Sequence, residues 1–428
     1  MNDIKQAVIV AGGLGKRLKD YNQGKPKILI TIGEDTLLDI QLRQLVIAGF
    51  RRCTFLLGYQ AEEIIEILEA KSHEYPLIID WVVEPKSLGT GGSIINALDK
   101  LEDIFAVIYG DLYLNLDFKA LEKEFLLKDA SFACVVHPSS HAYDSDLFEV
   151  EQNGRIKKFI SKHEARISPI RNIANSGIYI FRRNVLEKFS VAELDLDRDI
   201  VQNLIINGEA GVALRNKGYV RDVGTLERLK KIKDMSSFPE ISIGKRPALF
   251  LDRDGVLNRH VGHITSIEQI QIFPKIISLI SRFNEAGYLV IVLTNQPIIA
   301  HGKLDFEGLN AIHTSIDFEL SRHHAYIDQY YICPHHPDSG YRGEVKHLKK
   351  TCDCRKPKTG LLVQCLADFD IDLTSSIFIG DTWRDEELAQ QKGIPYISVN
   401  REEELESKVD EKIDSIQPKF RWGILQIN

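Results

Sequence analysis

The sequence predicts two doubly wound α/β domains in tandem. Short apolar runs that read as buried strands alternate with amphipathic helical stretches from Ala7 to about Asp234, and the alternation restarts at Ala248. A joint containing serine, proline and glycine (235–247) separates the two stretches. The length of 428 residues agrees with two or three domains. We therefore expect a first domain at 1–235, a linker at 236–246 and a second domain at 247–428.

The elements can be placed one by one from runs of apolar residues and their period. In the first domain we expect, in chain order, a strand at 7–10, a helix at 37–50, a strand at 53–59, a helix at 61–71, and strands at 77–84 and 106–109. In the second we expect a strand at 248–251, a helix at 276–286, a strand at 288–294, a helix at 306–323, a strand at 328–332, and a further helix before a strand at 376–379. This order favours mostly parallel sheets with helices on both faces.

Composition excludes several classes of protein. A formal charge of −7 argues against nucleic acid or an anionic membrane as the main partner. No apolar stretch approaches the roughly 18 residues that a transmembrane helix needs, and the first residues do not have the pattern of a signal peptide. Six cysteines, three of them clustered with histidine, indicate a metal site in a reducing compartment. We expect a cytoplasmic protein with small-molecule substrates; its oligomeric state stays open, a homo-oligomer included.

A glycine-rich loop follows the first strand. Gly12, Gly13 and Gly15 are followed by Arg17, and Lys27 lies ten residues further on. Glycines after a strand let backbone N–H groups approach a phosphate, and basic side chains neutralise its charge. The loop has neither the GxGxxG nor the Walker A pattern. Taken alone it is also compatible with an ordinary turn.

Five motifs in order give this loop a specific meaning. GGLGKRL…KPK, EPKSLGTGGS (84–93), YGDLYL (109–114), NSGIYIF (175–181) and RDVGT (221–225) span about 215 residues. Together they resemble the sugar-1-phosphate nucleotidyltransferases, which have a nucleotide-diphospho-sugar transferase (Rossmann-like) fold. In that family a sugar phosphate oxygen attacks the α-phosphorus of a nucleoside triphosphate and releases pyrophosphate, a step that depends on positioning and charge neutralisation.

The resemblance assigns roles to individual residues. It implies that Arg17 and Lys27 are catalytic and that Asp111 and Asp222 bind Mg²⁺. The substrate contacts that it implies are Gly12, Gly13, Gly15, Glu84, Gly89, Thr90, Gly91, Gly110, Lys162, Asn175 and Gly177. One departure concerns the sugar, because the chain has Ser-Lys-His at 161–163 where the family commonly has Glu-Lys-Pro. The loop also has Lys16 in place of the usual threonine.

A second phosphate site is predicted where the strand 248–251 ends. Asp252 and Asp254 follow it, with Gly255 behind them. In an extended chain, residues two apart point the same way, so we expect both carboxylates at one spot. Such a pair repels unless a cation or phosphate chemistry requires it. A solvated D-x-D-G turn is the alternative.

Three more motifs follow in order and favour phosphate chemistry. They are Thr294-Asn295, Arg355-Lys356 and GDTWRD (380–385). The set resembles the haloacid-dehalogenase (HAD) type phosphatases. The resemblance implies that Asp252 is the nucleophile, that Asp254 is general acid and then base, and that Thr294 and Lys356 stabilise phosphoryl oxygens. It further implies substrate contacts by Asn295 and Arg355. Mg²⁺ would be held by Asp252, Asp254 (through its backbone carbonyl) and Asp381.

A cysteine–histidine cluster predicts a second metal. Cys333 and His335 precede Cys352 and Cys354 by about sixteen residues. Three thiolates and one imidazole are typical of structural zinc. His336 is a competing ligand, and four unconnected residues are the plain alternative. Because Arg355 and Lys356 follow at once, we expect zinc to position the substrate-binding rim rather than to act in the chemistry.

The loop with the cysteines and histidines indicates which group of HAD-type phosphatases the second domain resembles. CPHHP followed by CxCRKP is similar to the heptose 1,7-bisphosphate phosphatases, with histidinol-phosphate phosphatases as close relatives. The chain departs from them at 294–302, where Pro297, Ile298 and His301 replace two small residues and an arginine. Removal of the 7-phosphate yields a heptose 1-phosphate, which a guanylyltransferase of the first kind would use. The two resemblances together imply a bifunctional enzyme of GDP-D-glycero-D-manno-heptose synthesis, serving lipopolysaccharide, S-layer or capsule formation.

Other functions fit parts of the pattern. One is a mannose- or other hexose-1-phosphate nucleotidyltransferase fused to a sugar-phosphate or histidinol-phosphate phosphatase. Another is a non-catalytic module that senses nucleotide sugars with one degenerate domain. The intact set of charged motif residues argues against the second of these.

Overall fold

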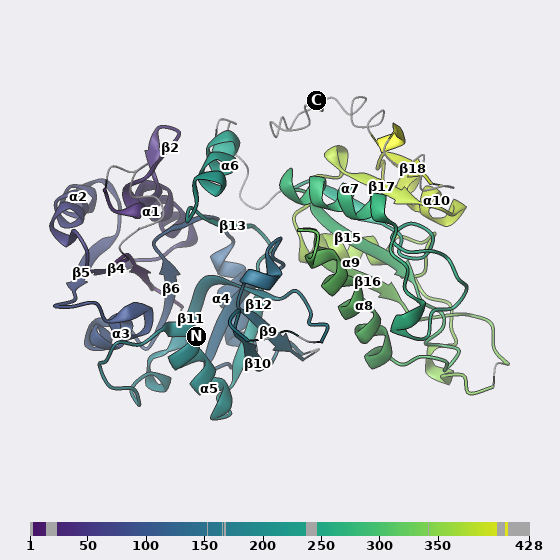
Figure 1. Ribbon diagram of the computed structural model, residues 1–428, viewed down its shortest axis with the longest axis horizontal. Helices are drawn as coiled ribbons and strands as arrows, with labels where there is room; N and C mark the ends of the chain where they lie inside the picture. Colours follow the sequence, from purple (N-terminus) through teal and green to yellow (C-terminus); the bar gives the residue numbers. More distant parts are fainter. Residues whose placement is uncertain are drawn as a thin grey trace. The chain divides into compact units, whose positions relative to one another are not determined.

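The protein has two compact α/β units, each described here by itself (Figure 1). The computed structural model describes residues 3–13, 24–151, 153–164, 166, 168–236, 246–340, 342–399 and 407–409. The first unit consists of Met1–His137, Asp146–His163 and Ile173–Gly244; the second consists of Pro138–Ser145, Glu164–Asn172 and Lys245–Asn428. The predicted fold class is confirmed. Most of the predicted linker and most of the C-terminal stretch, which the sequence left unplaced, lie outside the described residues.

A nine-stranded sheet is the framework of the first unit. Its parallel half consists of β5 (Ile78–Val83), β4 (Arg52–Leu57), β1 (Gln6–Val10) and β6 (Ile104–Tyr109) in that order. β11 (Ala174–Arg182) then pairs antiparallel with β6, and among the described strands beyond it only the pair of β12 (Gly211–Arg215) with β8 (Phe132–His137) is parallel. The sheet is therefore mixed rather than mostly parallel. The other strands are β9 (Leu147–Val150) and β10 (Ile156–Ile160).

Alternation along the central strand explains why this sheet is covered on both faces. In β1, Ala7 and Ile9 pack into one core cluster, whereas Val8 packs into the cluster on the opposite face. The first cluster takes in α1 (Leu37–Ala48), α2 (Ala61–Glu74) and α4 (Phe118–Leu127); the second takes in α3 (Gly89–Asn96), η6 (Leu196–Val201) and α5 (Gln202–Ile206). Outside the sheet, β7 (Leu112–Asn115) forms an antiparallel ladder with β13 (Tyr219–Asp222), which leads into α6 (Leu226–Ser236).

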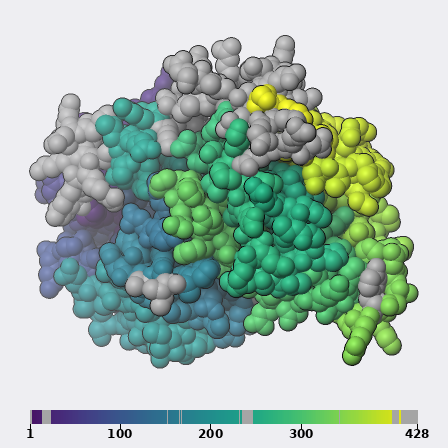
Figure 2. Space-filling model, turned by 45° about the vertical axis from the view of Figure 1, so that its right-hand side comes forward, coloured from purple at the N-terminus to yellow at the C-terminus, as the bar shows by residue number. Residues whose placement is uncertain are grey.

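Five parallel strands form the sheet of the second unit. Their order is β16 (Gln329–Cys333), β15 (Leu289–Asn295), β14 (Ala248–Leu251), β17 (Ile377–Gly380) and β18 (Tyr396–Ser398). α7 (Pro274–Glu285) and α8 (Phe306–Ser321) cover one face, and α9 (Gly360–Asp368) and α10 (Trp383–Gln391) cover the other. The space-filling view shows α10 and β18 in yellow-green to yellow (Figure 2). Each element predicted for this unit is present within two residues of its expected bounds.

Among the described residues, no helix has the length and apolar character that crossing a membrane requires.

Candidate active sites

Three motifs of the second unit meet at one edge of its sheet. Asp252 follows β14, Thr294 and Asn295 end β15, and Asp381 follows β17. The three strands are neighbours and parallel, so their carboxyl ends lie at the same edge. The backbone N–H of Asp252 donates to the carbonyl of Ile379 at 3.1 Å, which fixes the point where the chain leaves the sheet.

Three carboxylates gather at this edge. Ligand oxygens of Asp252, Asp381 and Asp385 all lie within 4.8 Å of one another. Asp385 is fully buried, and its Oδ2 accepts hydrogen bonds from the N–H and hydroxyl of Thr382 at 3.2 and 2.6 Å. Carboxylate oxygens are the ligands that Mg²⁺ prefers, so the cluster fits that ion. The sequence identified Asp381 as a ligand, but it left Asp385 without a metal role.

Gly255 closes one side of the cluster. Its φ of 95° is left-handed, and a Cβ placed there would lie 2.0 Å from Oδ2 of Asp381. Only glycine satisfies both conditions.

Lys356 is inserted among these carboxylates. Its Nζ lies 3.0 Å from Oδ1 of Asp252 and 2.6 Å from Oδ1 of Asp385, and it donates to the carbonyl of Leu293 at 2.7 Å. Burial lowers the pKa of Lys356, but the charges of Asp252 and Asp385 outweigh burial and raise it. Burial raises the pKa of Asp252 to about 6, although the nearby Lys356 charge opposes the rise. A buried nucleophile candidate is thus held beside a permanent cation.

Asp254 has different partners from Asp252. Both of its oxygens accept from the Arg253 guanidinium, at 2.8 to 3.1 Å, and Gln296 and Asn258 donate to it at 2.9 and 3.1 Å. Burial raises the pKa of Asp254, but Arg253, Gln296 and Asn258 outweigh burial and hold it below its usual value. The expectation that both carboxylates share one spot stays a prediction, although the charge of Asp254 contributes to the raised pKa of Asp252. The strand ends at Leu251, and the turn that follows separates their partners.

The neighbouring motif residues are tied to Lys356. The side chain of Asn295 accepts from the Lys356 N–H at 3.0 Å and donates to its carbonyl at 3.2 Å. Thr294 is buried, and its Oγ1 accepts from Gln296 at 3.0 Å. Arg355 is partly buried and donates to the carbonyl of His335 at 3.3 Å. Asn295 therefore has a clear structural role, and its predicted substrate contact stays a prediction.

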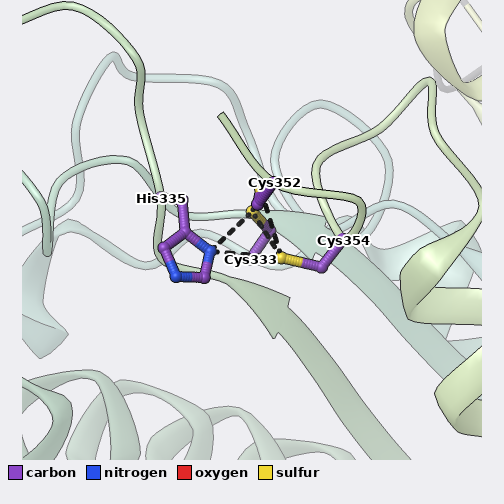
Figure 3. Close-up of side chains that lie close together, drawn as sticks. All are labelled: Cys333, His335, Cys352 and Cys354. Atoms are coloured by element: carbon purple, nitrogen blue, oxygen red, sulfur yellow. Dashed lines mark hydrogen bonds between the residues drawn. The ribbon is translucent and has the colours of Figure 1, made fainter. Parts of the chain in front are cut away.

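The predicted zinc ligands lie together at the end of β16 (Figure 3). The three sulfur atoms are 3.2, 3.4 and 3.6 Å apart, and Nδ1 of His335 lies 3.2 Å from the sulfur of Cys354. A tetrahedral zinc with Zn–S bonds of about 2.3 Å separates its sulfurs by roughly 3.8 Å. The cluster is therefore compatible with zinc. The competing His336 is not part of it: its Nδ1 accepts from the N–H of Asp338 at 3.3 Å.

The glycine loop of the first unit lies at the carboxyl ends of its parallel strands. A Cβ on Gly58, after β4, would lie 2.5 Å from a Glu84 oxygen and 3.2 Å from the carbonyl of Gly12. Glu84 accepts from the N–H of Leu88 at 3.0 Å, and burial raises its pKa. Gly110 donates to the carbonyl of Val10 at 2.9 Å. These close approaches explain Gly12, Gly58 and Gly110 at the sheet edge; a Cβ on the exposed Gly13 would meet no atom within 4 Å, and its predicted substrate contact stays a prediction. The predicted Gly15 and Arg17 lie outside the described residues.

The predicted catalytic lysine and metal carboxylates lie together. Nζ of Lys27 is 2.8 Å from Oδ2 of Asp111. Asp222 ends β13 opposite Leu112, and the N–H of the following Val223 donates to the carbonyl of Asp111 at 2.9 Å. Arg228, which the sequence did not indicate, donates to both oxygens of Asp222 at 2.7 and 2.8 Å. Burial raises the pKa of Asp222, but Arg228 outweighs burial and lowers it. Both carboxylates offer oxygen ligands that suit Mg²⁺.

Asn175 anchors a polar cluster below this site. Its Nδ2 donates to the Tyr179 hydroxyl at 2.6 Å and to Oδ1 of Asp197 at 2.7 Å, and its Oδ1 accepts from Gly177 at 3.0 Å. Tyr179 also donates to Asp197, at 2.7 Å. Burial raises the pKa of Asp197 to about 7, against the Tyr179 hydrogen bond; the Asp195 and Asp146 charges add to the rise. The sequence missed Asp197, because no motif covers this segment.

The remaining predicted contacts have a structural explanation or stay predictions. Gly91 donates its N–H to the carbonyl of Leu194 at 2.8 Å, and a Cβ on Gly89 would lie 2.5 Å from that carbonyl. Thr90 accepts from the N–H of Leu196 at 2.9 Å. These residues serve close packing at the start of α3, and their contact with a nucleobase stays a prediction. Lys162 is exposed, and its N–H donates to Asp146 at 2.8 Å.

Comparison with known families agrees with both units. Residues 6–236 match the family described as Nucleotidyl transferase, and residues 353–421 match the family described as HAD-hydrolase-like. The first match spans more than half of the 428 residues. The chain therefore belongs to the nucleotidyl transferase family and carries a HAD-type hydrolase domain behind it.

Curated relatives specify the hydrolase more closely. The chain is 36% identical over 143 residues to the D-glycero-beta-D-manno-heptose-1,7-bisphosphate 7-phosphatase of Photorhabdus laumondii, 33% of this chain and 74% of that protein. It is 36% identical over 154 residues to the protein of the same name from Rhodopseudomonas palustris, 36% of this chain and 83% of that protein. Because it covers more than two thirds of each, the chain also belongs to this phosphatase family.

Solved structures resemble the first part of the chain. A putative glucose-1-phosphate thymidylyltransferase from Bacillus anthracis, in complex with sucrose, is 17% identical with a TM-score of 0.50 and covers 55% of this chain and 97% of its own. It shows the fold. HddC from Yersinia pseudotuberculosis, complexed with GMP-PN, is 27% identical with a TM-score of 0.47 and covers 54% of this chain and 99% of its own. The chain is thus an enzyme with nucleotidyltransferase and phosphatase units that act on small molecules.

Proposed function

We propose that this chain catalyses two consecutive steps of GDP-D-glycero-D-manno-heptose synthesis. The second unit removes the 7-phosphate of heptose 1,7-bisphosphate, and the first transfers GMP from GTP to the resulting heptose 1-phosphate. The observation that carries the proposal is the placement of Lys356, 3.0 Å from Asp252 and 2.6 Å from Asp385, in a chain that is 36% identical to heptose bisphosphate 7-phosphatases. A cytoplasmic place and a supply role for lipopolysaccharide, S-layer or capsule belong to the same proposal.

In the phosphatase step, Asp252 attacks the phosphorus and forms an aspartyl phosphate as the bond to O7 breaks. Asp254 gives its proton to the leaving oxygen and then takes one from the water that hydrolyses the intermediate. The ionised form that its low pKa favours is the one needed for the second half. Lys356 and Thr294 stabilise the phosphoryl oxygens. Mg²⁺ held by Asp252, Asp381 and the backbone carbonyl of Asp254, with Asp385 as a further ligand, would neutralise charge between nucleophile and phosphate.

The zinc loop has a positioning role in this proposal. Cys354 lies two residues before Lys356, whose backbone N–H is bound by Asn295 at 3.0 Å. Cys333 ends β16, directly beside the end of β15. Zinc would tie the two segments together and so fix the distance of Lys356 from the sheet edge.

In the transferase step, Lys27 and Arg17 neutralise the triphosphate while the sugar phosphate oxygen attacks the α-phosphorus and pyrophosphate leaves. Lys162 would hold the sugar phosphate, and Asn175 the sugar. Mg²⁺ bound by Asp111 and Asp222 would balance the charge of the phosphates. Its binding has to replace the present pairing of these carboxylates with Lys27 and Arg228.

The test is an assay of the purified chain with heptose 1,7-bisphosphate and each nucleoside triphosphate, in which phosphate and pyrophosphate are followed separately. We expect phosphate release without nucleotide, and pyrophosphate release only when GTP and heptose 1-phosphate are both present. Mannose 1-phosphate and histidinol phosphate are the comparison substrates, because Ser161 and His163 depart from the family pattern around Lys162. Preference for either of them over the heptose would reject the proposed substrate.

A further inference from the structure

Two buried side chains beside the phosphatase centre have no part in the proposed chemistry. Arg253 is 1% exposed and Gln296 is 3% exposed. The Arg253 guanidinium grips the Asp254 carboxylate: Nε and Nη2 donate to Oδ1 at 3.1 and 3.0 Å, and Nη2 donates to Oδ2 at 2.8 Å. Arg253, which lies between Asp252 and Asp254 in the sequence, thus holds the carboxylate of Asp254.

Gln296 forms hydrogen bonds with both Arg253 and Asp254. Its Oε1 accepts from Nη2 of Arg253 at 3.0 Å, and its Nε2 donates to Oδ2 of Asp254 at 2.9 Å. The same Nε2 donates to Oγ1 of Thr294 at 3.0 Å. The amide therefore links Asp254, on the turn after β14, to the end of β15.

These contacts determine where the Asp254 carboxylate can point. The residue lies beyond the end of β14 and forms an isolated β-bridge with Asn258, so the sheet ladder does not fix it. Asn258 adds one further donor to Oδ1 at 3.1 Å. Proton transfer requires the carboxylate within hydrogen-bond reach of the reacting oxygen, and a displacement of about 1 Å costs roughly 100-fold in rate.

We propose that Arg253 and Gln296 are positioning residues that hold the Asp254 carboxylate in place for both proton transfers of the phosphatase. This inference rests on the proposed function. The proton that Asp254 gives to O7 as the P–O7 bond breaks is regained from the water that attacks the aspartyl phosphate, so the two halves balance. Arg253 and Gln296 touch neither the substrate nor the transferred phosphoryl group in this assignment.

The first test compares leaving groups. Gln296→Met and Arg253→Lys should slow single-turnover release of sugar 1-phosphate from the bisphosphate by about 10- to 100-fold, since a positioned acid contributes roughly 10²–10⁴-fold. Single-turnover release of nitrophenolate from p-nitrophenyl phosphate, which precedes hydrolysis of the aspartyl phosphate, should change by less than about 3-fold, because that leaving group hardly needs a proton. Gln390→Met, an exposed glutamine on α10, is the matched control and should alter neither rate.

The second test is a double-mutant cycle. If Gln296 acts through Asp254, adding Gln296→Met to Asp254→Asn should cost less than about 2-fold beyond the single Asp254→Asn change. Thermal unfolding of every variant separates loss of fold from loss of rate. Equal slowing of both leaving groups, or multiplicative losses in the cycle, would overturn the positioning role. The cycle is measured over multiple turnovers of p-nitrophenyl phosphate, because hydrolysis of the aspartyl phosphate needs Asp254 as base whatever the leaving group. A wild-type enzyme that rejects the heptose would therefore sink the proposed function and leave this test standing.

Discussion

The two units present their charged residues to phosphate in opposite ways. In the second unit, the Lys356 side chain is 2% exposed and that of Asp385 is 0% exposed. In the first, the side chains of Lys27, Asp111 and Asp222 are 20%, 28% and 37% exposed. Among the described residues, the lysine and carboxylate of the second unit are thus buried, whereas those of the first unit are partly exposed. A covalent intermediate needs a fixed nucleophile, but a transferase must admit two large anions before it can neutralise them.

The largest difference between the two units is expected when the proposed nucleophile of the second unit is removed. Asp252→Asn should lower phosphate release by on the order of 10⁴-fold or more, because a residual rate without the nucleophile depends only on binding and charge. Pyrophosphate release with heptose 1-phosphate and GTP should remain at the wild-type rate. Simultaneous loss of both activities in a folded variant would contradict two independent centres.

The reciprocal change tests the open site. Lys27→Met should lower pyrophosphate release by about 10²- to 10³-fold, the usual cost of removing one preorganised positive donor. Phosphate release from the bisphosphate should not change. Lys123→Met, an exposed lysine of the same unit, is the control. A loss of similar size with Lys123→Met would mean that net charge, not the pairing of Lys27 with Asp111, governs the rate.

Zinc removal sharpens the comparison, because only the phosphatase centre is tied to the cysteine cluster. Cys352→Ser, or a strong chelator followed by Mg²⁺, should lower phosphate release by roughly 100-fold through displacement of Lys356. Bound zinc is measured by atomic absorption, with one zinc per chain expected in the wild type. Transferase activity should survive. An unchanged phosphatase rate in zinc-free protein would show that the loop holds its shape without the metal.

The smallest expected effect concerns pH. The pKa of Asp252 is raised to about 6, so its carboxylate binds a proton as the pH falls from 7 to 5. A protonated carboxyl is a poor metal ligand, so Mg²⁺ affinity of the phosphatase centre should drop by about 10-fold over this range. Calorimetric titration of the Asp111→Asn protein, which lacks a proposed metal ligand of the transferase site, measures the phosphatase centre. An affinity that rises as the pH falls has the wrong sign for a carboxylate ligand.

The sequence predicted most of the framework and the order of the motifs. Apolar runs marked β1, β14, β15 and β17 because both faces of these strands are buried, and a predicted phosphate motif follows or ends each of them. The antiparallel half of the first sheet was not predicted, because strand direction depends on long-range pairing that local patterns do not record.

Individual partners were harder to predict than motifs. Arg228 and Asp197 reach their partners through tertiary packing, and no spacing rule marks them. The hydrogen-bond partners of Asp254 were not predicted either, because a rule for extended chains says nothing of the segment that follows the end of β14. Gln296 lies inside a motif that the sequence did identify, yet its hydrogen bonds become apparent only when β14 and β15 are side by side.

The left-handed glycine behind the two aspartates has a consequence for how the enzyme can vary. A Cβ at position 255, which lies beyond the end of β14, would collide with an oxygen of Asp381, one of the proposed Mg²⁺ ligands. Exchanges there should yield soluble, well-folded chains that have lost one of their two reactions. A living cell that makes such a variant should accumulate the bisphosphate. The rate of its transferase reaction would then show how strongly the second step depends on the first.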